Sequence, residues 1–320
     1  MTDLHGTRRP RAVFFGTPDF ASVVLKSLLS PNSPVDVALV ITQPDRPVGR
    51  SQTLTPPPVK VIATAHNIAV RQPLSLRRPH AITAIVGSGA DVGVVVAYGR
   101  ILPVDLLNAF PYGCLNVHAS LLPRWRGAWP IGAAIQAGDA ETGVTIMRLD
   151  AGMDTGPVLA TRRRPLGEAE TTASLSPILA EDGASLLREV LPDYLRGERE
   201  PTPQDDALAT WCRMVSKADG LIDWTRSAVD LARHVRAMDD WPGAWTTWGG
   251  RRLVIREATA APQESDGVPG VVHVGDGDVT VSTGCGRLAL RVVQVEGRAA
   301  LNASAFARGQ RSFAGSVLGT

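Results

Sequence analysis

Lysine, cysteine and long apolar runs are scarce in this chain of 320 residues. Lysine occurs only at Lys26, Lys60 and Lys217, so arginine supplies nearly all of the 33 basic side chains. Arginine suits bidentate phosphate contacts, but a codon bias explains the same excess. The 31 acidic residues leave a net charge of only +2. Overall charge therefore does not point to a nucleic-acid partner, and an RNA-binding surface would have to come from the arrangement of charges.

The three cysteines, Cys114, Cys212 and Cys285, are far apart in the sequence and match neither a metal-ligand spacing nor a disulfide framework. No run of eighteen apolar residues predicts a membrane span. Residues 1–10 are polar and lack the apolar segment of a signal peptide. We therefore expect a cytoplasmic, reduced protein without metal or membrane contact, in which residues 1–10 are disordered.

What the chain does contain, over roughly its first half, is an alternation of short apolar runs and helical patterns. The expected strands cover 12–15, 35–42, 68–71, 91–97, 113–118 and 142–149. The expected helices cover a segment that ends near residue 29, then 58–66, 80–88, 103–109, 128–137 and the long segment 172–196. Such alternation predicts an α/β fold with an open, mostly parallel, Rossmann-like sheet and crossover helices. Ligands bind outside the carboxyl ends of the strands in such sheets.

The pattern changes after residue 196. Residues 197–206 are charged and contain proline, which predicts an exposed linker that we place at 197–210. A helix at 227–238 and short β-runs follow, at 244–248, 253–258, 271–274, 279–282 and 288–295. Glycine-rich turns separate these runs, and the combination predicts a small, OB-like β-barrel. The expected domains are therefore a catalytic domain at 11–196 and a C-terminal domain at 211–320.

Three polar residues form the most informative constellation. Asn116 and His118 are two apart at the end of an expected strand, so both side chains lie on one face. Asp154 lies in a glycine-bracketed loop after a neighbouring strand. An amide that stabilises an oxyanion, an imidazole that moves a proton and an orienting carboxylate together suit acyl transfer. Singly, each residue has a plainer structural interpretation, as a local hydrogen-bonding group or a turn former. No nucleophilic serine or cysteine has a supporting motif, which favours direct transfer.

The sequence resembles the formyltransferase family that uses 10-formyltetrahydrofolate, from about residue 11 to 315. Asn116, His118 and Asp154 carry this resemblance together with Ser120-Leu-Leu-Pro123. Further matching motifs are Phe15-Gly-Thr-Pro-Asp-Phe20, Gln43-Pro-Asp-Arg-Pro47, Pro58-Val-Lys60, Val94-Val-Val-Ala-Tyr98-Gly99, Ile101-Leu-Pro103, Gly138-Asp-Ala-Glu-Thr-Gly-Val-Thr-Ile146, Ser216-Lys217, Ile222-Asp-Trp224 and Trp241-Pro-Gly-Ala-Trp245. The chain is more similar to members that formylate methionyl-tRNA than to those that formylate glycinamide ribonucleotide.

This resemblance implies a function and roles for particular residues. The implied reaction moves the formyl group of 10-formyltetrahydrofolate to the α-amino group of methionyl-initiator tRNA, for translation initiation, with a monomeric enzyme and a tRNA-binding C-terminal domain. Asn116, His118 and Asp154 become the catalytic residues. Residues that would bind the folate are Tyr98, Gly99, Ile101, Leu102, Ser120, Leu121, Leu122 and Pro123. For the tRNA, Arg46 would reach the acceptor end, and Arg126 would contact phosphate or support the site.

The chain departs from the family pattern at two places. Residues 51–54 replace a loop that often carries lysine, which predicts fewer phosphate contacts and a weaker salt dependence. Ala119 stands where glycine is frequent, which matters only if the backbone there needs a positive φ. Two other functions stay open: formylation of a sugar amine or glycinamide ribonucleotide, and RNA binding without chemistry. The second domain argues against the first of these, and the three catalytic residues argue against the second.

Overall fold

The computed structural model describes residues 8–49, 51–261, 267–275 and 277–319. Most of the N-terminus predicted to be disordered, and Arg50, lie outside these described residues. The chain divides into two compact units: Met1–Pro130, Glu141–Pro165 and Ser176–Cys212 form the first, and Ile131–Ala140, Leu166–Leu175 and Arg213–Thr320 form the second. In the described part of the chain, no helix has the length and apolar character that a membrane crossing needs.

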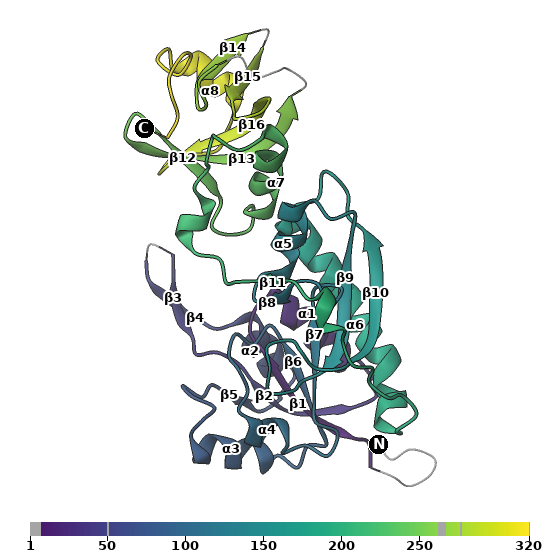
Figure 1. Cartoon of the computed structure of the whole chain (residues 1–320). Coiled ribbons are helices and arrows are strands. Elements are labelled where there is room, and N and C mark those ends of the chain that lie inside the picture. The colour runs from purple at the N-terminus through teal and green to yellow at the C-terminus, as the bar shows by residue number, and fades with distance from the viewer. Residues whose placement is uncertain (1–7, 50, 262–266, 276, 320) are drawn as a thin grey trace. The chain divides into compact units, whose positions relative to one another are not determined.

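A seven-stranded sheet forms the centre of the first unit, with the strand order β10-β9-β7-β6-β1-β2-β5 (Figure 1). Its strands are β1 (Arg11–Gly16), β2 (Asp36–Ile41), β5 (Val70–Arg71), β6 (Val92–Val96), β7 (Cys114–His118), β9 (Glu141–Arg148) and β10 (Val158–Pro165). Strands β5, β2, β1, β6 and β7 pair in parallel, whereas β9 and β10 add two antiparallel strands at one edge. Every residue of β6 and β7 is buried, as expected for the centre of a parallel sheet.

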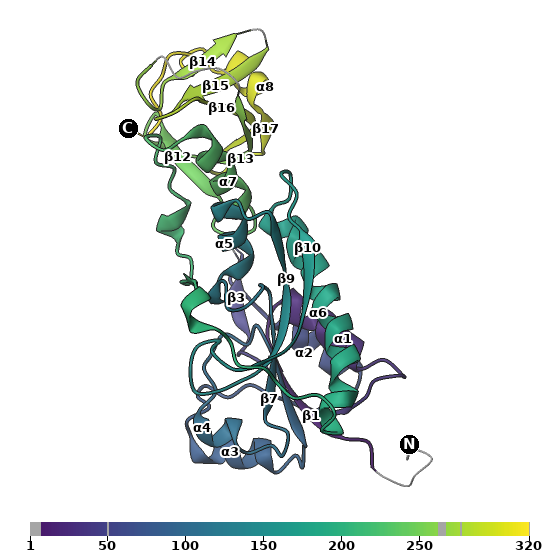
Figure 2. The same ribbon diagram turned by 45° about the vertical axis from the view of Figure 1, so that its right-hand side comes forward.

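The helices α1 (Asp19–Leu28), α2 (Pro58–Ala65), α3 (Pro79–Val86), α4 (Val104–Leu107) and most of α6 (Thr172–Leu195) belong to the same unit as this sheet. Helix α5 (Pro130–Ala137) falls almost wholly in the second unit. The long helix α6 runs along the sheet beside β9 and β10 (Figure 2). Gly183 permits its close approach, because a Cβ there would lie 2.5 Å from Cγ1 of Val117 in β7. The face of β7 that carries Val117 is therefore occupied by α6, and the polar residues of β7 lie on the other face.

The order of the parallel strands reverses between β1 and β6. From β1 the chain proceeds to β2 and β5, and from β6 it proceeds to β7 on the opposite side. Such a switch point leaves a crevice at the carboxyl ends of the two strands, where ligands bind in open α/β sheets. The loops that follow the two strands are joined there, because Thr17 Oγ1 donates a hydrogen bond to the Tyr98 carbonyl oxygen at 3.2 Å.

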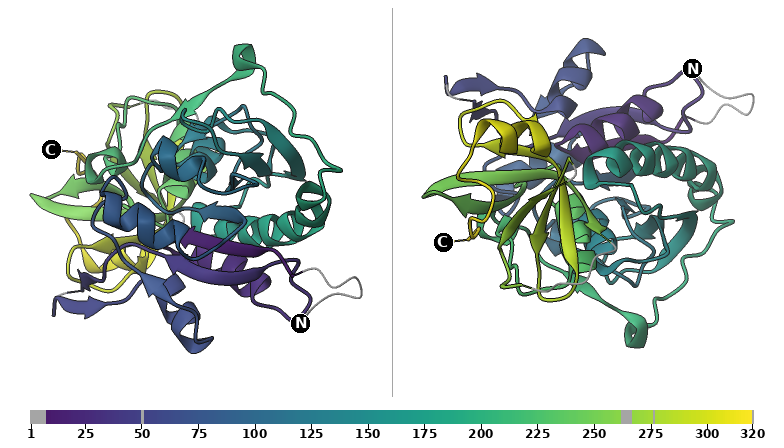
Figure 3. Two further views of the ribbon diagram at one scale, coloured as in Figure 1. Left: turned by 90° about the horizontal axis from the view of Figure 1, so that it is seen from below. Right: turned by 90° about the horizontal axis from the view of Figure 1, so that it is seen from above.

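An antiparallel sheet forms the second unit, in the order β12-β13-β16-β15-β14, with β17 paired to β16. The strands are β12 (Ala244–Trp248), β13 (Arg251–Ala261), β14 (Val272–Gly275), β15 (Asp278–Ser282), β16 (Arg287–Val295) and β17 (Leu301–Asn302), with helices α7 (Ala228–Ala237) and α8 (Ala303–Gly309). The right-hand view of Figure 3 shows these green to yellow strands as a twisted fan. The rings of Trp248, Phe306 and Phe313 pack edge to face, so this tryptophan forms part of the apolar packing of the second unit.

The predicted fold class, an open α/β sheet followed by a small β domain, is confirmed. The strands that the sequence pattern did not predict are short or at edges: β3 (Arg46–Val48), β4 (Thr53–Thr55), β8 (Arg126–Gly127), β11 (Trp211–Cys212), β10 and β17, and the pattern also omitted α8. Strands β3 and β4 form a hairpin whose six residues are all exposed, so apolar burial provides no signal for it. Short 3-10 helices occur at Asp206–Leu208 and Lys217–Gly220.

Candidate active site

The polar face of β7 provides two of the three expected catalytic residues. Asn116 and His118 are buried, with 8% and 6% of their surface exposed, and they share this face with Cys114. Cys114 packs into the apolar cluster with Phe110, and burial raises the pKa of its thiol to about 12. Cys114 is therefore a protonated, inert thiol. No hydrogen bond joins the Asn116 carboxamide to another described residue, so this amide is available to a ligand.

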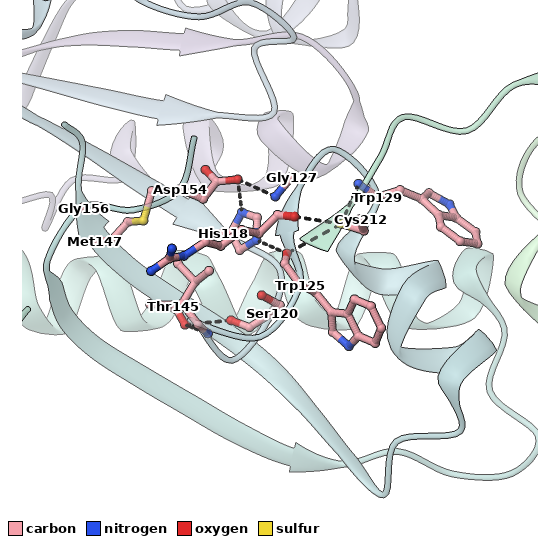
Figure 4. Close-up of polar contacts among 12 residues, drawn as sticks. His118, Ser120, Trp125, Gly127, Trp129, Thr145, Met147, Asp154, Gly156 and Cys212 are labelled. Atoms are coloured by element: carbon pink, nitrogen blue, oxygen red, sulfur yellow. Dashed lines mark hydrogen bonds and ion pairs between the residues drawn. The ribbon is translucent and has the colours of Figure 1, made fainter. Parts of the chain in front are cut away.

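The imidazole of His118 lies between a carboxylate and a backbone carbonyl (Figure 4). Its Nε2 is 3.0 Å from the Trp125 carbonyl oxygen, and a carbonyl only accepts, so this bond requires the hydrogen on Nε2. Its Nδ1 lies 3.8 Å from Asp154 Oδ2, within ion-pair reach but beyond hydrogen-bond length. The Gly127 N–H donates to the same carboxylate oxygen at 2.8 Å. The structure thus brings His118 and Asp154 together.

Both residues that flank the imidazole have an unusual backbone. Asp154 has φ 55° and Trp125 has φ 62°, which places them in the left-handed region that residues other than glycine rarely adopt. Strain of this kind costs on the order of 1–3 kcal/mol and persists only where the surroundings fix it. Two of the few non-glycine residues in this region therefore contact one histidine, which is typical of a functional site. Ala119 has an ordinary φ, so its methyl group needs no strained conformation.

The Ser120–Pro123 turn after β7 is held by hydrogen bonds to Arg124 and to Thr145 of β9. Ser120 Oγ donates to the Arg124 carbonyl oxygen at 2.6 Å. The buried hydroxyl of Thr145 donates to the Ser120 carbonyl oxygen at 2.7 Å and accepts from the Leu122 N–H at 3.2 Å. Ser120 and Leu122 are buried, whereas Leu121 and Pro123 are partly exposed. These bonds fix the shape of the turn. That the turn contacts folate stays a prediction.

The loop after β6 presents only some of the residues expected to bind folate. Tyr98 and Leu102 are buried in the apolar cluster, where the Tyr98 ring meets Phe15 edge to face. Burial raises the pKa of the Tyr98 phenol. Gly99 and Ile101 are exposed, the latter to 70%. Gly99 has no side chain, so among these residues only Ile101 presents an exposed side chain, while Tyr98 and Leu102 pack in the apolar cluster that supports the loop.

Arg126 is buried, with 2% of its surface exposed, and its guanidinium is already occupied. It donates to Gln204 Oε1 from Nε at 3.1 Å and from Nη2 at 2.9 Å, and to Asp206 Oδ1 at 2.6 Å. The guanidinium also lies 5.4 Å from the ring centroid of Trp211. These contacts favour the second of the two roles expected for Arg126, support of the site, over contact with tRNA phosphate.

Arg46, the other residue expected to contact tRNA, is exposed at the start of the β3–β4 hairpin. A polar cluster holds the base of this hairpin. Lys60 Nζ donates to both carboxylate oxygens of Asp45, at 2.9 and 2.8 Å, and to Gln72 Oε1 at 3.0 Å. The hydrogen bond from Lys60 holds the pKa of Asp45 below its usual value. Gln43 Nε2 donates to the Tyr98 carbonyl oxygen at 3.1 Å, which ties the hairpin base to the loop after β6.

Gln204 is a residue of this site that the sequence pattern did not reveal. Its Nε2 donates to the carbonyl oxygens of Asp154 and Gly156, at 2.8 and 2.7 Å. It lies in the segment predicted to be an exposed linker, and no spacing distinguishes it from its charged neighbours. Among the described residues, no group of three histidine, cysteine or acidic side chains could hold a metal ion.

Comparison with known protein families matches both parts of the chain. A family described as "Formyl transferase" matches residues 10–191, and one described as "Formyl transferase, C-terminal domain" matches residues 214–311. The chain belongs to the formyl transferase family. Its relatives include the methionyl-tRNA formyltransferase of Myxococcus xanthus, 46% identical over 96% of this chain and 97% of the relative. The methionyl-tRNA formyltransferase of Citrifermentans bemidjiense is 45% identical over 97% of this chain and 96% of the relative.

Solved structures show the same fold at lower identity. HypX from Aquifex aeolicus, in complex with tetrahydrofolic acid, aligns with a TM-score of 0.61 and 20% identity over 96% of this chain and 48% of that chain. A second solved structure is the N-formyltransferase from Helicobacter canadensis in complex with folinic acid and dTDP-3-aminofucose. It aligns with a TM-score of 0.63 and 17% identity over 88% of this chain and 99% of that chain. At these identities the likeness concerns the fold alone.

Proposed function

We propose that this protein transfers the formyl group of 10-formyltetrahydrofolate to the α-amino group of methionyl-initiator tRNA. The observation that carries the proposal is the close approach of His118 to Asp154, with the buried carboxamide of Asn116 on the same face of β7 as His118. Similarity over nearly the whole chain to methionyl-tRNA formyltransferases supports the choice of substrate. The protein works as a monomer in the cytoplasm, where its charged tRNA substrate is found.

The site residues can be given roles in this reaction. The Asn116 carboxamide donates a hydrogen bond to the oxyanion that develops when the methionyl nitrogen attacks the formyl carbon. His118 is anchored through Nε2 to the Trp125 carbonyl, which leaves Nδ1 to take up the proton that the attacking nitrogen loses. The Asp154 carboxylate, 3.8 Å away, stabilises the resulting imidazolium until the proton passes to the departing folate nitrogen.

The formyl donor fits the loops that surround this site. No described atom lies within 4 Å of the Cβ position at Gly99, which has φ +81°, and Ile101 presents an exposed apolar side chain next to it. Open space beside a glycine and an apolar neighbour suit a flat ring system. Gly99, Ile101 and the Ser120–Pro123 turn would hold the folate. When bound, the donor supplies a formyl carbon that gains a bond to the methionyl nitrogen and loses its bond to the folate nitrogen.

A single-turnover assay tests the proposal. The protein is mixed with 10-formyltetrahydrofolate and methionyl-initiator tRNA, with glycinamide ribonucleotide as acceptor in a parallel reaction. We expect formylation of the tRNA, and a rate loss on the order of a hundredfold or more in Asn116→Ala, His118→Ala and Asp154→Ala. Transfer only to the small amine would refute the substrate, and near-wild-type rates in these variants would refute the assigned residues.

A further inference from the structure

The carboxamide of Gln204 uses its entire hydrogen-bonding capacity within the site. Its two N–H hydrogens serve the carbonyl oxygens of Asp154 and Gly156, and its oxygen accepts twice from Arg126. An amide has two donors and two acceptor lone pairs, so all four positions are filled. The opposite orientation would set oxygen against two carbonyls and an NH₂ against a guanidinium, so the neighbours determine the orientation seen here.

These bonds close a ring around the proposed catalytic carboxylate. Gln204 holds the backbone of Asp154, which has the left-handed φ of 55°. On its other side Gln204 holds Arg126, whose neighbour Gly127 donates its N–H to Asp154 Oδ2. Both the backbone and the carboxylate of Asp154 are therefore fixed by groups that Gln204 connects. A left-handed aspartate needs such external restraint to keep its conformation.

The chain on both sides of Gln204 is itself paired with the two loops that this residue joins. Thr202 exchanges two backbone hydrogen bonds with Val158, just after the Asp154 loop, at 2.7 and 2.8 Å. Strand β11 pairs in parallel with β8, in the register Trp211 opposite Arg126. These pairings hold the chain on both sides of Gln204 against the two loops, so the carboxamide bridges segments that are already paired through their backbones.

We propose that Gln204 is a positioning residue for formyl transfer, which sets the placement of Asp154 relative to His118 through its two donated hydrogen bonds. The inference rests on the proposed function, because it assigns Gln204 to the same catalytic group. A purely structural residue would lower stability alone. A positioning residue lowers the rate of the chemical step in protein that remains folded, and does so only while Asp154 is present to be positioned.

Two substitutions separate the donated from the accepted bonds. Gln204→Glu keeps the acceptors for Arg126 but sets a carboxylate against the carbonyls of Asp154 and Gly156. Gln204→Ala removes both sets. The matched control is Gln294→Ala, because Gln294 also accepts from an arginine through Oε1, at 2.9 and 2.7 Å from Arg256, and donates to a carbonyl through Nε2, but on the second unit.

Single-turnover rates and KM values for donor and tRNA provide the first readout. We expect Gln204→Glu and Gln204→Ala to lower the rate of transfer on the order of tenfold to a hundredfold, the effect of misplacing a catalytic group by up to about 1 Å. The KM values should stay within about twofold, and Gln294→Ala should keep the wild-type rate. In an Asp154→Asn background the Gln204 substitutions should have almost no further effect, because coupled residues are non-additive. A wild-type rate in Gln204→Glu, or full additivity with Asp154→Asn, would overturn the proposal.

Amide hydrogen exchange of Gly127 gives a second readout that needs no turnover. Its N–H is bonded to Asp154 Oδ2, so displacement of Asp154 should accelerate its exchange about tenfold in Gln204→Glu and leave it unchanged in Gln294→Ala. Unchanged exchange in Gln204→Glu would refute the positioning role even if the wild-type protein formylated nothing. Accelerated exchange without wild-type turnover would instead support the positioning of Asp154 and refute the proposed function.

Discussion

Substitution of Gly127 by alanine tests whether the close packing of Gly127 against Cys212 is needed to keep Asp154 in place. Gly127 has φ +118°, and a Cβ at this residue would lie 2.0 Å from the Cys212 carbonyl oxygen. Carbon and oxygen atoms pack at about 3.5 Å, so the two paired segments would have to separate by about 1 Å or more. The strained backbone costs about 1–3 kcal/mol, and the forced separation costs a further ~1–3 kcal/mol. Most domains have enough stability to remain folded after such a loss.

The effect on catalysis should exceed the effect on folding. The Gly127 N–H holds Asp154, so a shift of about 1 Å should lower kcat on the order of a hundredfold while KM for the folate changes little. The control is Gly197→Ala, where φ is +73° but nothing lies within 4 Å, so only backbone strain is added and kcat should be unchanged. Steady-state kinetics together with the folded fraction from circular dichroism would decide the matter. A folded Gly127→Ala protein with wild-type kcat would refute the reasoning.

Three further predictions concern the rest of the chain. A chain that ends after residue 212 keeps the β8–β11 pairing and should melt at a higher temperature than one that ends after residue 207, as calorimetry would show. Burial lowers the pKa of His234, so the unfolded chain binds its proton first. The free energy of unfolding should therefore fall by up to about 1.4 kcal/mol per pH unit as the pH drops below about 6.5. Urea titrations at several pH values should show a smaller pH dependence of this free energy in His234→Leu. Burial raises the pKa of Cys114 to about 12, whereas Cys285 is exposed. Iodoacetamide at pH 8 should therefore label Cys285 before Cys114, as mass spectrometry would show, and equal labelling of the two cysteines would contradict this expectation.

The fold was largely predictable because burial leaves a clear periodic signal. The strand β6 is a continuous apolar run that is buried along its whole length, so its sequence alone identifies it. The edge strand β10 lacks such a run, since it carries three successive arginines, of which Arg163 is exposed and Arg162 and Arg164 are partly buried. The hairpin β3–β4 has no buried residue at all. Elements that hydrogen bonds rather than apolar burial hold together therefore escape a pattern based on hydrophobicity.

The candidate site was predictable only where side-chain alternation or resemblance applied. The two-residue spacing of Asn116 and His118 places both on one face of β7, and the structure has them there. No such rule relates His118 to Asp154, which is more than thirty residues away, and only the resemblance joined them. Gln204 lies farther still, and its importance comes from four hydrogen bonds to two loops that no periodicity connects. Because glutamine is a common polar residue of exposed segments, composition predicted a linker at the place where the chain returns to support the proposed catalytic aspartate.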